Sequence, residues 1–256
     1  MTNDKKELVQ PILNTITNSD IKEFAMVLLE DMPDYIWHIG ASSTGKYHPT
    51  YSLGEGGLMR HQIAVVRFLN FFFELEQYNS KLTTRQMDLM RVAGLLHDGR
   101  KSGSQQDYET SKYTRFNHPL LMADEIRKYD GKYLDHEEIE FIADVVSKHM
   151  GQWSEDRKSN VVLPKPSDRF SRMLHVADYL ASRKCLTMDF TGYIEPKSTT
   201  INPEEYVLPF GKYSGQKLID IYKAHPDYCD WMENNIHKRD VLSVLKMVKE
   251  KCKNED

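Results

Sequence analysis

The chain has 256 residues, of which 40% are hydrophobic and 28% charged, and this composition is ordinary for a soluble globular protein. Its formal net charge of −4 and pI near 6.2 argue against a protein that grips long duplex DNA nonspecifically. No apolar run of about 18 residues occurs and the N-terminus, MTNDKKELVQ, lacks an apolar signal core, so we expect no membrane partner and a cytoplasmic location.

The first part of the chain predicts one helix and then a long loop. Apolar residues recur on one helical face from Asn18 to Glu30. The segment from Pro33 to Gly57 is rich in Gly, Ser, Thr, Pro and Tyr and has no clean period, which predicts a loop. Loops of this length in compact domains are usually functional or disordered. Because this one holds aromatics and leads directly to His61, the first candidate metal ligand, we interpret it as functional.

Capping signals mark the helices that follow. A predicted helix from about Gly57 to Glu76 precedes one that begins at a capping box of Thr83 and Gln86 and carries the apolar run Met90 to Leu96. The second of these is apolar nearly all round, so we expect it at the centre of a helical bundle. Three more predicted helices begin at polar residues, which are Asn117 with Pro119 in the first turn, Asp135 with Glu138, and Ser167 or Asp168.

Composition changes after about Leu186. The stretch TGYIEPKSTTINPEE is rich in Pro, Ser and Thr, which indicates a linker. We therefore predict a first domain over residues 1–186, a linker over 187–204 and a small C-terminal module over 205–256. The module is expected to hold a turn or short strand and then two or three short helices. The predicted fold class is mostly α, a helical bundle followed by a small α or α/β module.

Six residues with imidazole or carboxylate groups lie in or at the edge of predicted helices: His61, His97, Asp98, His118, His149 and Asp178. These groups bind divalent metals such as Mn²⁺, Fe²⁺, Zn²⁺ or Mg²⁺. A single His in a helix is usually a polar residue whose hydrogen bonds are satisfied. The hypothesis of a metal site therefore depends on all six residues together. Asp98 ends a buried helix and Asp178 lies in an equally apolar one, where a charge without a partner is unfavourable. Facing helices of a bundle can each donate a side chain inward, and shared cations would then satisfy all six.

Motifs around these residues resemble a known family. GGLMRH, LLHDGRK, NHP, SKHMGQW and LHVADYLASRK are similar, in this order, to the motifs of the HD-domain metal-dependent phosphohydrolases, over roughly residues 45 to 185. The resemblance implies two divalent ions, of Mn, Fe, Mg, Ni or Zn, and a water between them that attacks phosphorus. It implies that one ion is held by His61, His97, Asp98 and Asp178, and the other by Asp98, His118 and His149.

The same resemblance suggests substrate contacts. In many relatives the motif is HD-x-x-K and the Lys contacts substrate phosphate, which implies catalytic roles for Asp98 and Lys101. Arg100 adds a second cation here, and we predict a catalytic role for it as well. For both cations the alternative is a solvated loop charge. The stretch STGKYHP offers hydroxyls and cations of the kind that hold phosphate. We predict substrate contacts from Ser43, Thr44, Lys46 and His48.

Two further resemblances concern the family branch. GKYHP followed by GEGGLMRH is similar to HD hydrolases known from bacterial and phage genomes, and a phage-encoded protein would work in the host cytoplasm. The metal-centre segments also resemble bacterial HD-domain 3′-5′ exoribonucleases. We expect the N-terminal oligonucleotide-binding β-barrel of those enzymes to be missing, because residues 1 to 44 are too short and too helical.

The tail LPFGKYSGQKLIDIYKAHPDYCDWM resembles a module with an FGKYxGxxL core, found at the C-terminus of some DNA exonucleases and phage proteins. Its aromatics would stack on a single strand and its lysines would neutralise the phosphates. The alternative is that the aromatics form the core of the module. The residues concerned are Phe210, Lys212, Tyr213, Lys217, Tyr228 and Trp231.

Three functions stay open on these grounds. The favoured one is a metal-dependent phosphohydrolase, a phosphodiesterase or nuclease that cleaves phosphoester bonds of single-stranded nucleic-acid ends or of nucleotides. The second is a hydrolase of small nucleotides alone, such as a dNTP, a nucleoside monophosphate or a cyclic nucleotide, which the acidic charge and the missing barrel favour. The third is a non-catalytic binding module that metals stabilise.

Overall fold

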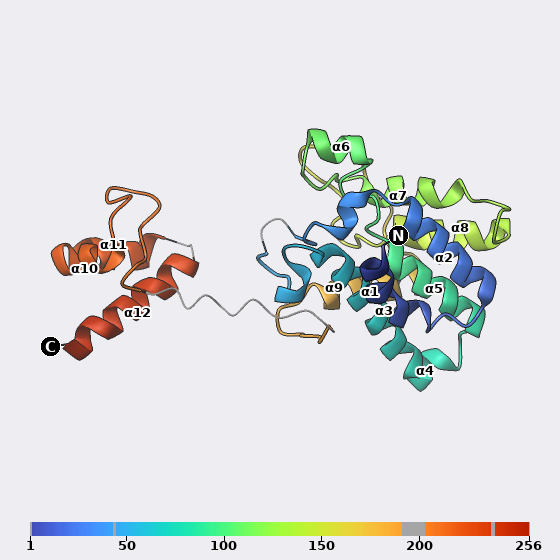
Figure 1. Cartoon of the computed structure of the whole chain (residues 1–256), viewed down its shortest axis with the longest axis horizontal. Helices are drawn as coiled ribbons and strands as arrows, with labels where there is room; N and C mark the ends of the chain where they lie inside the picture. The colour runs from blue at the N-terminus through green and yellow to red at the C-terminus, as the bar shows by residue number, and fades with distance from the viewer. Residues whose placement is uncertain (1, 43–44, 191–202, 237–238, 256) are drawn as a thin grey trace. The chain divides into compact units, whose positions relative to one another are not determined.

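The computed structural model describes residues 2–42, 45–190, 203–236 and 239–255, of which 239, 240, 243 and 253–255 are described by their backbone alone. Two compact units divide the chain, one over Met1–Ile194 and the other over Glu195–Asp256. Both are built from helices (Figure 1). Within the described ranges the backbone forms two isolated β-bridges and no β-strand. The predicted mostly α fold class is therefore confirmed.

The helices of the first unit that the structure describes are α1 (Asn3–Leu13), α2 (Ser19–Asp31), α3 (Gly57–Glu74), α4 (Glu76–Asn79), α5 (Thr84–Leu96), α6 (Gln105–Thr110), α7 (His118–Arg127), α8 (His136–Ser147) and α9 (Arg169–Ala181), with two short 3-10 helices, η1 (Asp34–Trp37) and η2 (Thr50–Ser52). The second unit holds α10 (Leu218–Ala224), α11 (Pro226–Asn235) and α12 (Arg239–Glu255). Most of the linker predicted over 187–204 falls on 191–202, which lie outside the described residues.

Local side-chain chemistry explains where these helices begin. The predicted capping box is present at α5, where Thr83 accepts from the Gln86 backbone amide and the Gln86 side chain caps in return. Asp168 caps α9 in the same reciprocal way. The predicted capping of α7 by the Asn117 side chain is wrong. Asn117 stands at the N-cap, but its side chain makes no capping hydrogen bond. Pro119 in the first turn supplies a backbone angle already suited to a helix.

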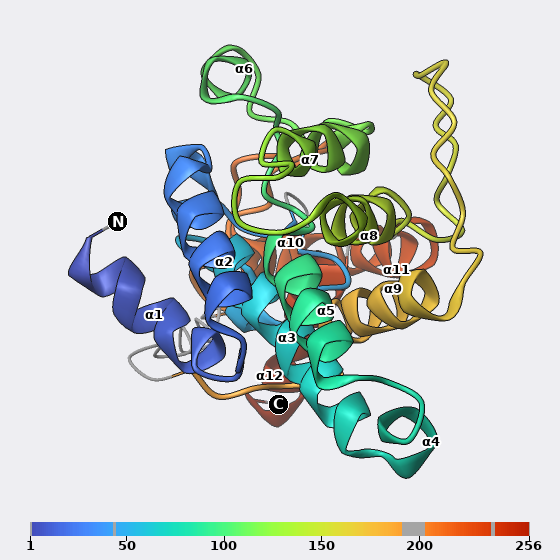
Figure 2. The ribbon, with the colours of Figure 1, turned by 90° about the vertical axis from the view of Figure 1, so that its right-hand side faces the viewer.

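Helix α5 lies at the centre of the first unit, as its apolar sequence predicts. It packs against α2, α3, α8 and α9, and Figure 2 shows it among them. Every residue from Val92 to Gly99 is buried. Burying one Leu or Met side chain contributes about 1.5–3 kcal/mol. The core thus continues to the last turn of α5 and beyond it, to the position of His97 and Asp98.

The predicted long loop, Pro33 to Gly57, contains η1 and η2 and is tied to the start of α3. The backbone amide of Ala41 donates to the Ser52 carbonyl over 2.8 Å. A Cβ atom at Gly57 would lie 2.5 Å from that same carbonyl oxygen, so the close approach requires glycine. This packing fixes the first turn of α3 and, one turn later, the position of His61.

The second unit has a core of its own. Its buried side chains are Leu208, Leu218, Ile219, Ile221, Cys229, Met232, Val241, Val244, Leu245 and Val248. An isolated bridge joins Val207 to Lys217 around the glycine-containing turn. The module is therefore a closed turn followed by three helices in its described part. Tyr213 and Tyr228 pack against its core, whereas Trp231 stays 49% exposed.

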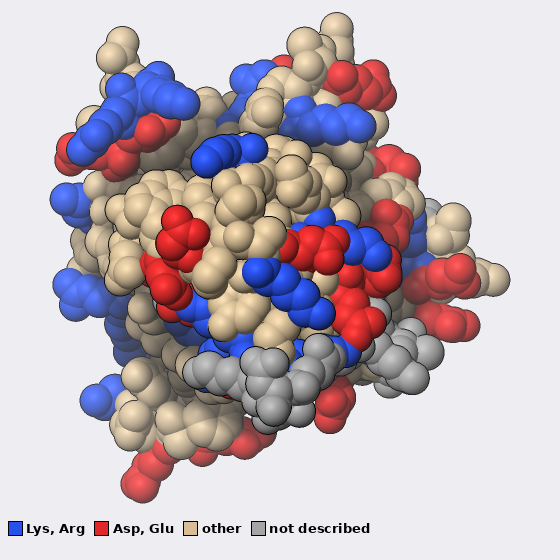
Figure 3. All heavy atoms as spheres, turned by 90° about the vertical axis from the view of Figure 1, so that its left-hand side faces the viewer, with Lys and Arg blue, Asp and Glu red and all other residues tan. Residues whose placement is uncertain are grey.

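The surface carries charges of both signs. On the face drawn in Figure 3, basic and acidic side chains are interspersed. Nonspecific duplex binding uses a surface of one positive sign, so this face agrees with the conclusion drawn from net charge. None of the helices in the described part of the chain combines the length and the apolar composition that crossing a membrane requires.

Candidate metal centre

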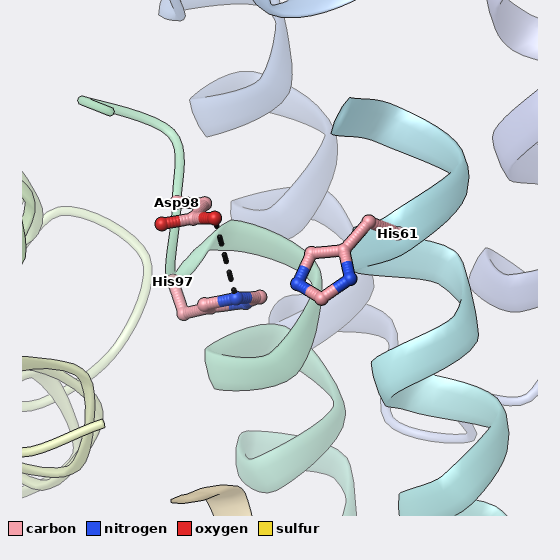
Figure 4. A group of neighbouring side chains, drawn as sticks. All are labelled: His61, His97 and Asp98. Atoms are coloured by element: carbon pink, nitrogen blue, oxygen red, sulfur yellow. Dashed lines mark ion pairs between the residues drawn. The ribbon is translucent and has the colours of Figure 1, made fainter. Parts of the chain in front are cut away.

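The six predicted ligands come from five helices or helix ends and meet beside the C-terminal end of α5. His61 lies in the second turn of α3, His97 and Asp98 directly follow α5, His118 opens α7, His149 follows α8, and Asp178 lies in the third turn of α9. All are buried except Asp178, whose side chain is 22% exposed. Figure 4 shows the imidazoles of His61 and His97 side by side with Asp98 next to them.

Asp98 belongs to two groups of donor atoms. One group is His61, His97 and Asp98, the other is Asp98, His118 and His149, and within each group the donor atoms lie within 4.8 Å of one another. The Oδ1 atom of Asp98 lies 2.9 Å from Nε2 of His118 and 3.7 Å from Nε2 of His149. Its Oδ2 atom lies 3.8 Å from Nε2 of His97. The carboxylate therefore stands between the two groups.

Asp178, on α9, lies beside two members of the first group. Its Oδ1 atom lies 3.0 Å from Nε2 of His61 and 3.8 Å from Nε2 of His97. It also shares a third set of close donor atoms with His97 and His149. Every predicted ligand thus lies within reach of at least two others.

Backbone carbonyls orient three of the four imidazoles. Their Nδ1 atoms donate to the carbonyls of the preceding turn: His97 to Gly94 over 2.9 Å, His118 to Arg115 over 2.7 Å, and His149 to Val146 over 2.8 Å. A neutral imidazole whose Nδ1 carries the proton presents a lone pair on Nε2. That form binds a metal, and the carbonyl contact fixes the orientation of the ring.

Two features of the cluster fit a bound cation. The Nε2 atoms of His118 and His149 lie 3.2 Å apart although both rings already donate through Nδ1. Burial, with neighbouring His97, lowers the pKa of His149 to about 3, so this ring is neutral near pH 7 and its Nε2 atom presents a lone pair. The buried Nε2 atom of His97 has no hydrogen-bond partner among the described residues. Imidazole and carboxylate donors in this arrangement suit a divalent metal.

Both carboxylates stay ionised. Burial by itself would raise the pKa of Asp98, but Lys101 and His97 hold it well below its usual range. Burial likewise opposes ionisation of Asp178, but the hydrogen bond from His61 keeps its pKa below the usual range. The Nζ atom of Lys101 lies 2.5 Å from Oδ2 of Asp98. Two carboxylates against this ammonium leave negative charge in a buried site, which again favours bound cations.

A pocket of about 290 Å³ opens onto the cluster. Of the predicted substrate-binding residues, His48 lines it, and burial lowers the pKa of His48 to about 4, so the ring is neutral near pH 7. Lys46 is exposed and does not line the pocket. Ser43 and Thr44 lie outside the described residues.

The two cations after Asp98 have different partners. Lys101 lines the pocket and pairs with Asp98 three residues earlier, on the same side of the turn. Arg100 points to another side of the turn, where its guanidinium lies 2.6 Å from the carboxylate of Glu125 and lines a separate pocket. The structure brings Lys101 to the cluster and does not bring Arg100 there.

Three further residues lie beside the ligands, and none of them is among the predicted site residues. Trp153 and Arg183 line the pocket, and Nδ1 of His175 donates to the carbonyl of His149 over 2.9 Å. All three lie inside the quoted motifs SKHMGQW and LHVADYLASRK. Their proximity to the ligand residues in sequence was the available signal.

The fold and the site together define an all-helical domain with a buried His and Asp cluster that fits divalent metal. A family model described as HD domain matches residues 58–183, a segment that contains all six predicted ligands. The match supports the HD-domain superfamily, whose members are generally metal-dependent hydrolases. No curated protein and no solved structure matches the chain.

Proposed function

We propose that this protein is a metal-dependent phosphohydrolase that cleaves phosphoester bonds of nucleotides or of nucleic-acid ends. The observation that carries the proposal is the pair of donor groups that share Asp98 in a buried site. The pocket beside the cluster gives a phosphoester room to reach it, and Lys101 on its wall supplies a positive charge. The HD-domain match supports the same reaction class.

The six residues would hold two divalent ions. One would lie between His61, His97, Asp98 and Asp178, and the other between Asp98, His118 and His149. Such a pair, when bound, lowers the pKa of a water and neutralises phosphoryl oxygens. The donor set accepts Mn, Fe, Ni, Zn or Mg, and we propose Mn²⁺ for the first tests.

The remaining residues bind and orient the substrate. Lys101 pairs with Asp98 on the wall of the pocket, and its ammonium would form a charge-assisted hydrogen bond with a phosphate oxygen once bound cations balance that carboxylate. His48 is neutral and its Nδ1 atom is buried without a hydrogen-bond partner among the described residues, so it is available to a substrate group. Both contacts position the phosphoester without adding negative charge to it.

Hydrolysis restricted to small nucleotides is the second candidate. The pocket of about 290 Å³ lies at the lower end of the size range of small-molecule sites, which favours a mononucleotide or a strand end over an internal position of a polymer. The C-terminal module favours a polymer instead, because half-exposed Trp231 stacks on Tyr228 with ring centroids 5.5 Å apart. Its Lys217, however, pairs with Glu205 over 3.1 Å.

A substrate panel tests the proposal. The Mn²⁺-loaded full-length protein would receive a labelled single-stranded oligonucleotide, a set of mono-, tri- and cyclic nucleotides, and bis-p-nitrophenyl phosphate, with chelator-treated protein as the control. We expect turnover that depends on added metal. Stepwise shortening of the oligonucleotide would indicate polymer activity, which Trp231→Leu should then weaken, and turnover of nucleotides alone would indicate the second candidate. Bound metal without turnover of any substrate would contradict the proposal and favour a non-catalytic binding module.

A further inference from the structure

Planar side chains form a continuous series at one side of the pocket. The rings of Trp153 and Tyr179 are nearly parallel, with an interplanar angle of 14° and centroids 6.0 Å apart. The guanidinium of Arg183 lies 4.1 Å from the centroid of Tyr179 and 5.5 Å from that of Tyr47. Trp153 and Arg183 line the same pocket as Asp98. We call these four residues the aromatic ladder.

The rings of the aromatic ladder are open to solvent. Trp153 is 46% exposed, Tyr179 37% and Tyr47 54%, whereas Trp37 is buried in the core at 8%. Exposed aromatic faces that gather beside a polar pocket present apolar area to a ligand. Packing in the protein core therefore explains the position of Trp37 but not that of Trp153.

The turn that carries Trp153 also carries a candidate ligand. Gly151, at φ +63°, lies so close to His175 that a Cβ atom would approach the imidazole carbon Cε1 to 2.1 Å. His175 in turn holds the carbonyl of His149 and packs edge-on against Trp153, with centroids 6.0 Å apart. The position of Trp153 is thus fixed relative to the metal cluster before any substrate binds, which reduces the loss of entropy on binding.

Arg183 adds positive charge to the aromatic ladder. Its guanidinium donates to the Tyr179 carbonyl over 3.2 Å and to the Ser182 hydroxyl over 2.9 Å. In the part of the chain that the structure describes, no carboxylate forms an ion pair with it. One wall of the pocket therefore offers an aromatic face and an uncompensated cation together. A ligand that matches both has a planar ring system and an anionic group.

We propose that the aromatic ladder is a nucleobase subsite, in which the base of the substrate stacks on Trp153 while its phosphoester lies at the metal cluster. The inference rests on the proposed function for the place of the phosphoester. It assigns the base of such a nucleotide, free or at a strand end, to a defined aromatic face beside the metal cluster. Stacking on an aromatic face tolerates any base, because every base has a π-face.

Two ligands that differ only in the base test this subsite. Adenosine 5′-monophosphate and ribose 5-phosphate would be titrated into the full-length protein with Mn²⁺, and the dissociation constants measured by calorimetry. We expect the nucleotide to bind about tenfold more tightly than the sugar phosphate, as stacking on an aromatic ring implies. It should also quench tryptophan fluorescence, and the sugar phosphate should not.

Variants of the full-length protein locate the effect. Trp153→Leu should remove most of the preference for the nucleotide and the quenching, and Trp153→Tyr, which keeps a planar face, should retain most of the preference. Phe71→Leu is the matched control, since Phe71 is 55% exposed and does not line the pocket. Circular dichroism would check that each variant is folded.

Equal affinity of the wild type for both ligands, or no binding of the nucleotide, would overturn the inference, as would equal weakening of both ligands by Trp153→Leu. Failure of the proposed function has a different result. A Trp153-dependent preference for the nucleotide without turnover of any phosphoester would support the base subsite and contradict the proposed hydrolysis. Turnover of phosphoesters without a preference for the nucleotide would support hydrolysis and contradict the base subsite.

Discussion

Two buried aspartates ten residues apart, one near the middle of α5 and one just after its end, have opposite surroundings. Asp88 is saturated with donors. Its Oδ2 atom accepts from the amide and hydroxyl of Thr17, over 3.0 and 2.8 Å, and from the amide of Asn18 over 3.0 Å. Its Oδ1 atom lies 2.7 Å from the guanidinium of Arg91. Protein groups alone balance this carboxylate, and it ties the start of α2 to α5.

Asp98 lies among imidazoles that already donate a proton elsewhere, through Nδ1. Beyond the pair with Lys101, its neighbours include Nε2 atoms of His118 and His149, whose rings already donate through Nδ1. A buried acid surrounded by donors stabilises the fold, whereas one surrounded by further acceptors requires a cation. The comparison separates a structural carboxylate from a metal ligand by the direction of the hydrogen bonds around it.

Exchanging the two acids for their amides gives the largest expected effect. Asp98→Asn removes the carboxylate that both donor groups share and should reduce metal-dependent turnover about a thousandfold or more, equivalent to about 4 kcal/mol of transition-state stabilisation. Asp88→Asn, the matched control, should keep wild-type turnover per folded molecule. Steady-state rates with bis-p-nitrophenyl phosphate would check both. Equal loss of turnover in the two variants would contradict the distinction between them.

The stability of the fold, unlike turnover, should depend strongly on Asp88. Asp88→Ala leaves the largely buried Arg91 guanidinium without its carboxylate partner, and we expect the free energy of unfolding of the first unit to fall by about 3–5 kcal/mol. Urea denaturation followed by circular dichroism would measure it. Asp124→Ala is the control, because its pair with Arg127 is 70% exposed on the aspartate side and should change stability by at most about 1 kcal/mol. Equal effects of the two substitutions would remove the structural role of Asp88.

Metal removal should destabilise the wild type and leave Asp98→Asn nearly unchanged. Ions that bind only the folded state add about 2.7 kcal/mol when they are present at a hundred times their dissociation constant. A chelator should therefore lower the melting temperature of the wild type by several degrees, roughly 2–4 °C per kcal/mol for a unit of this size. Differential scanning calorimetry with and without chelator would show it. A chelator effect of the same size in Asp98→Asn would indicate that metal binds elsewhere.

The smallest expected effect on turnover distinguishes Lys101 from its neighbour Arg100. Lys101→Met should reduce turnover about 10- to 100-fold, because a hydrogen bond to a charged group contributes about 1.5–3 kcal/mol. Arg100→Met should leave turnover close to the wild-type value, since Arg100 pairs with Glu125 away from the cluster. Rates of the two variants measured side by side would check this. Greater loss from Arg100→Met would restore the catalytic role that its place in the sequence suggests.

Local patterns allowed much of this molecule to be predicted. The capping boxes, the apolar sequence of α5 and the motif order are all encoded by residues close together in the chain. They were enough to predict the mostly α fold and to select six residues that the structure places together. The apolar helices around Asp98 and Asp178 gave the physical reason to expect cations there.

The features that the sequence did not predict depend on packing between distant segments. Whether Arg100 or Lys101 faces the cluster depends on the direction of one turn and on the place of Glu125 in α7. The aromatic ladder depends on Trp153 and Tyr179 meeting across the connection between α8 and α9. Neither contact leaves a periodic or spaced pattern in the sequence.

Metal stoichiometry tests the central claim most directly. The full-length protein, equilibrated with Mn²⁺ and freed of unbound ion by dialysis, would be analysed for manganese per chain alongside Asp98→Asn and Asp88→Asn. The shared position of Asp98 predicts two ions per chain in the wild type and in Asp88→Asn, and fewer than one in Asp98→Asn. A wild type that retains no metal, or an Asp98→Asn variant that still holds two ions, would contradict it.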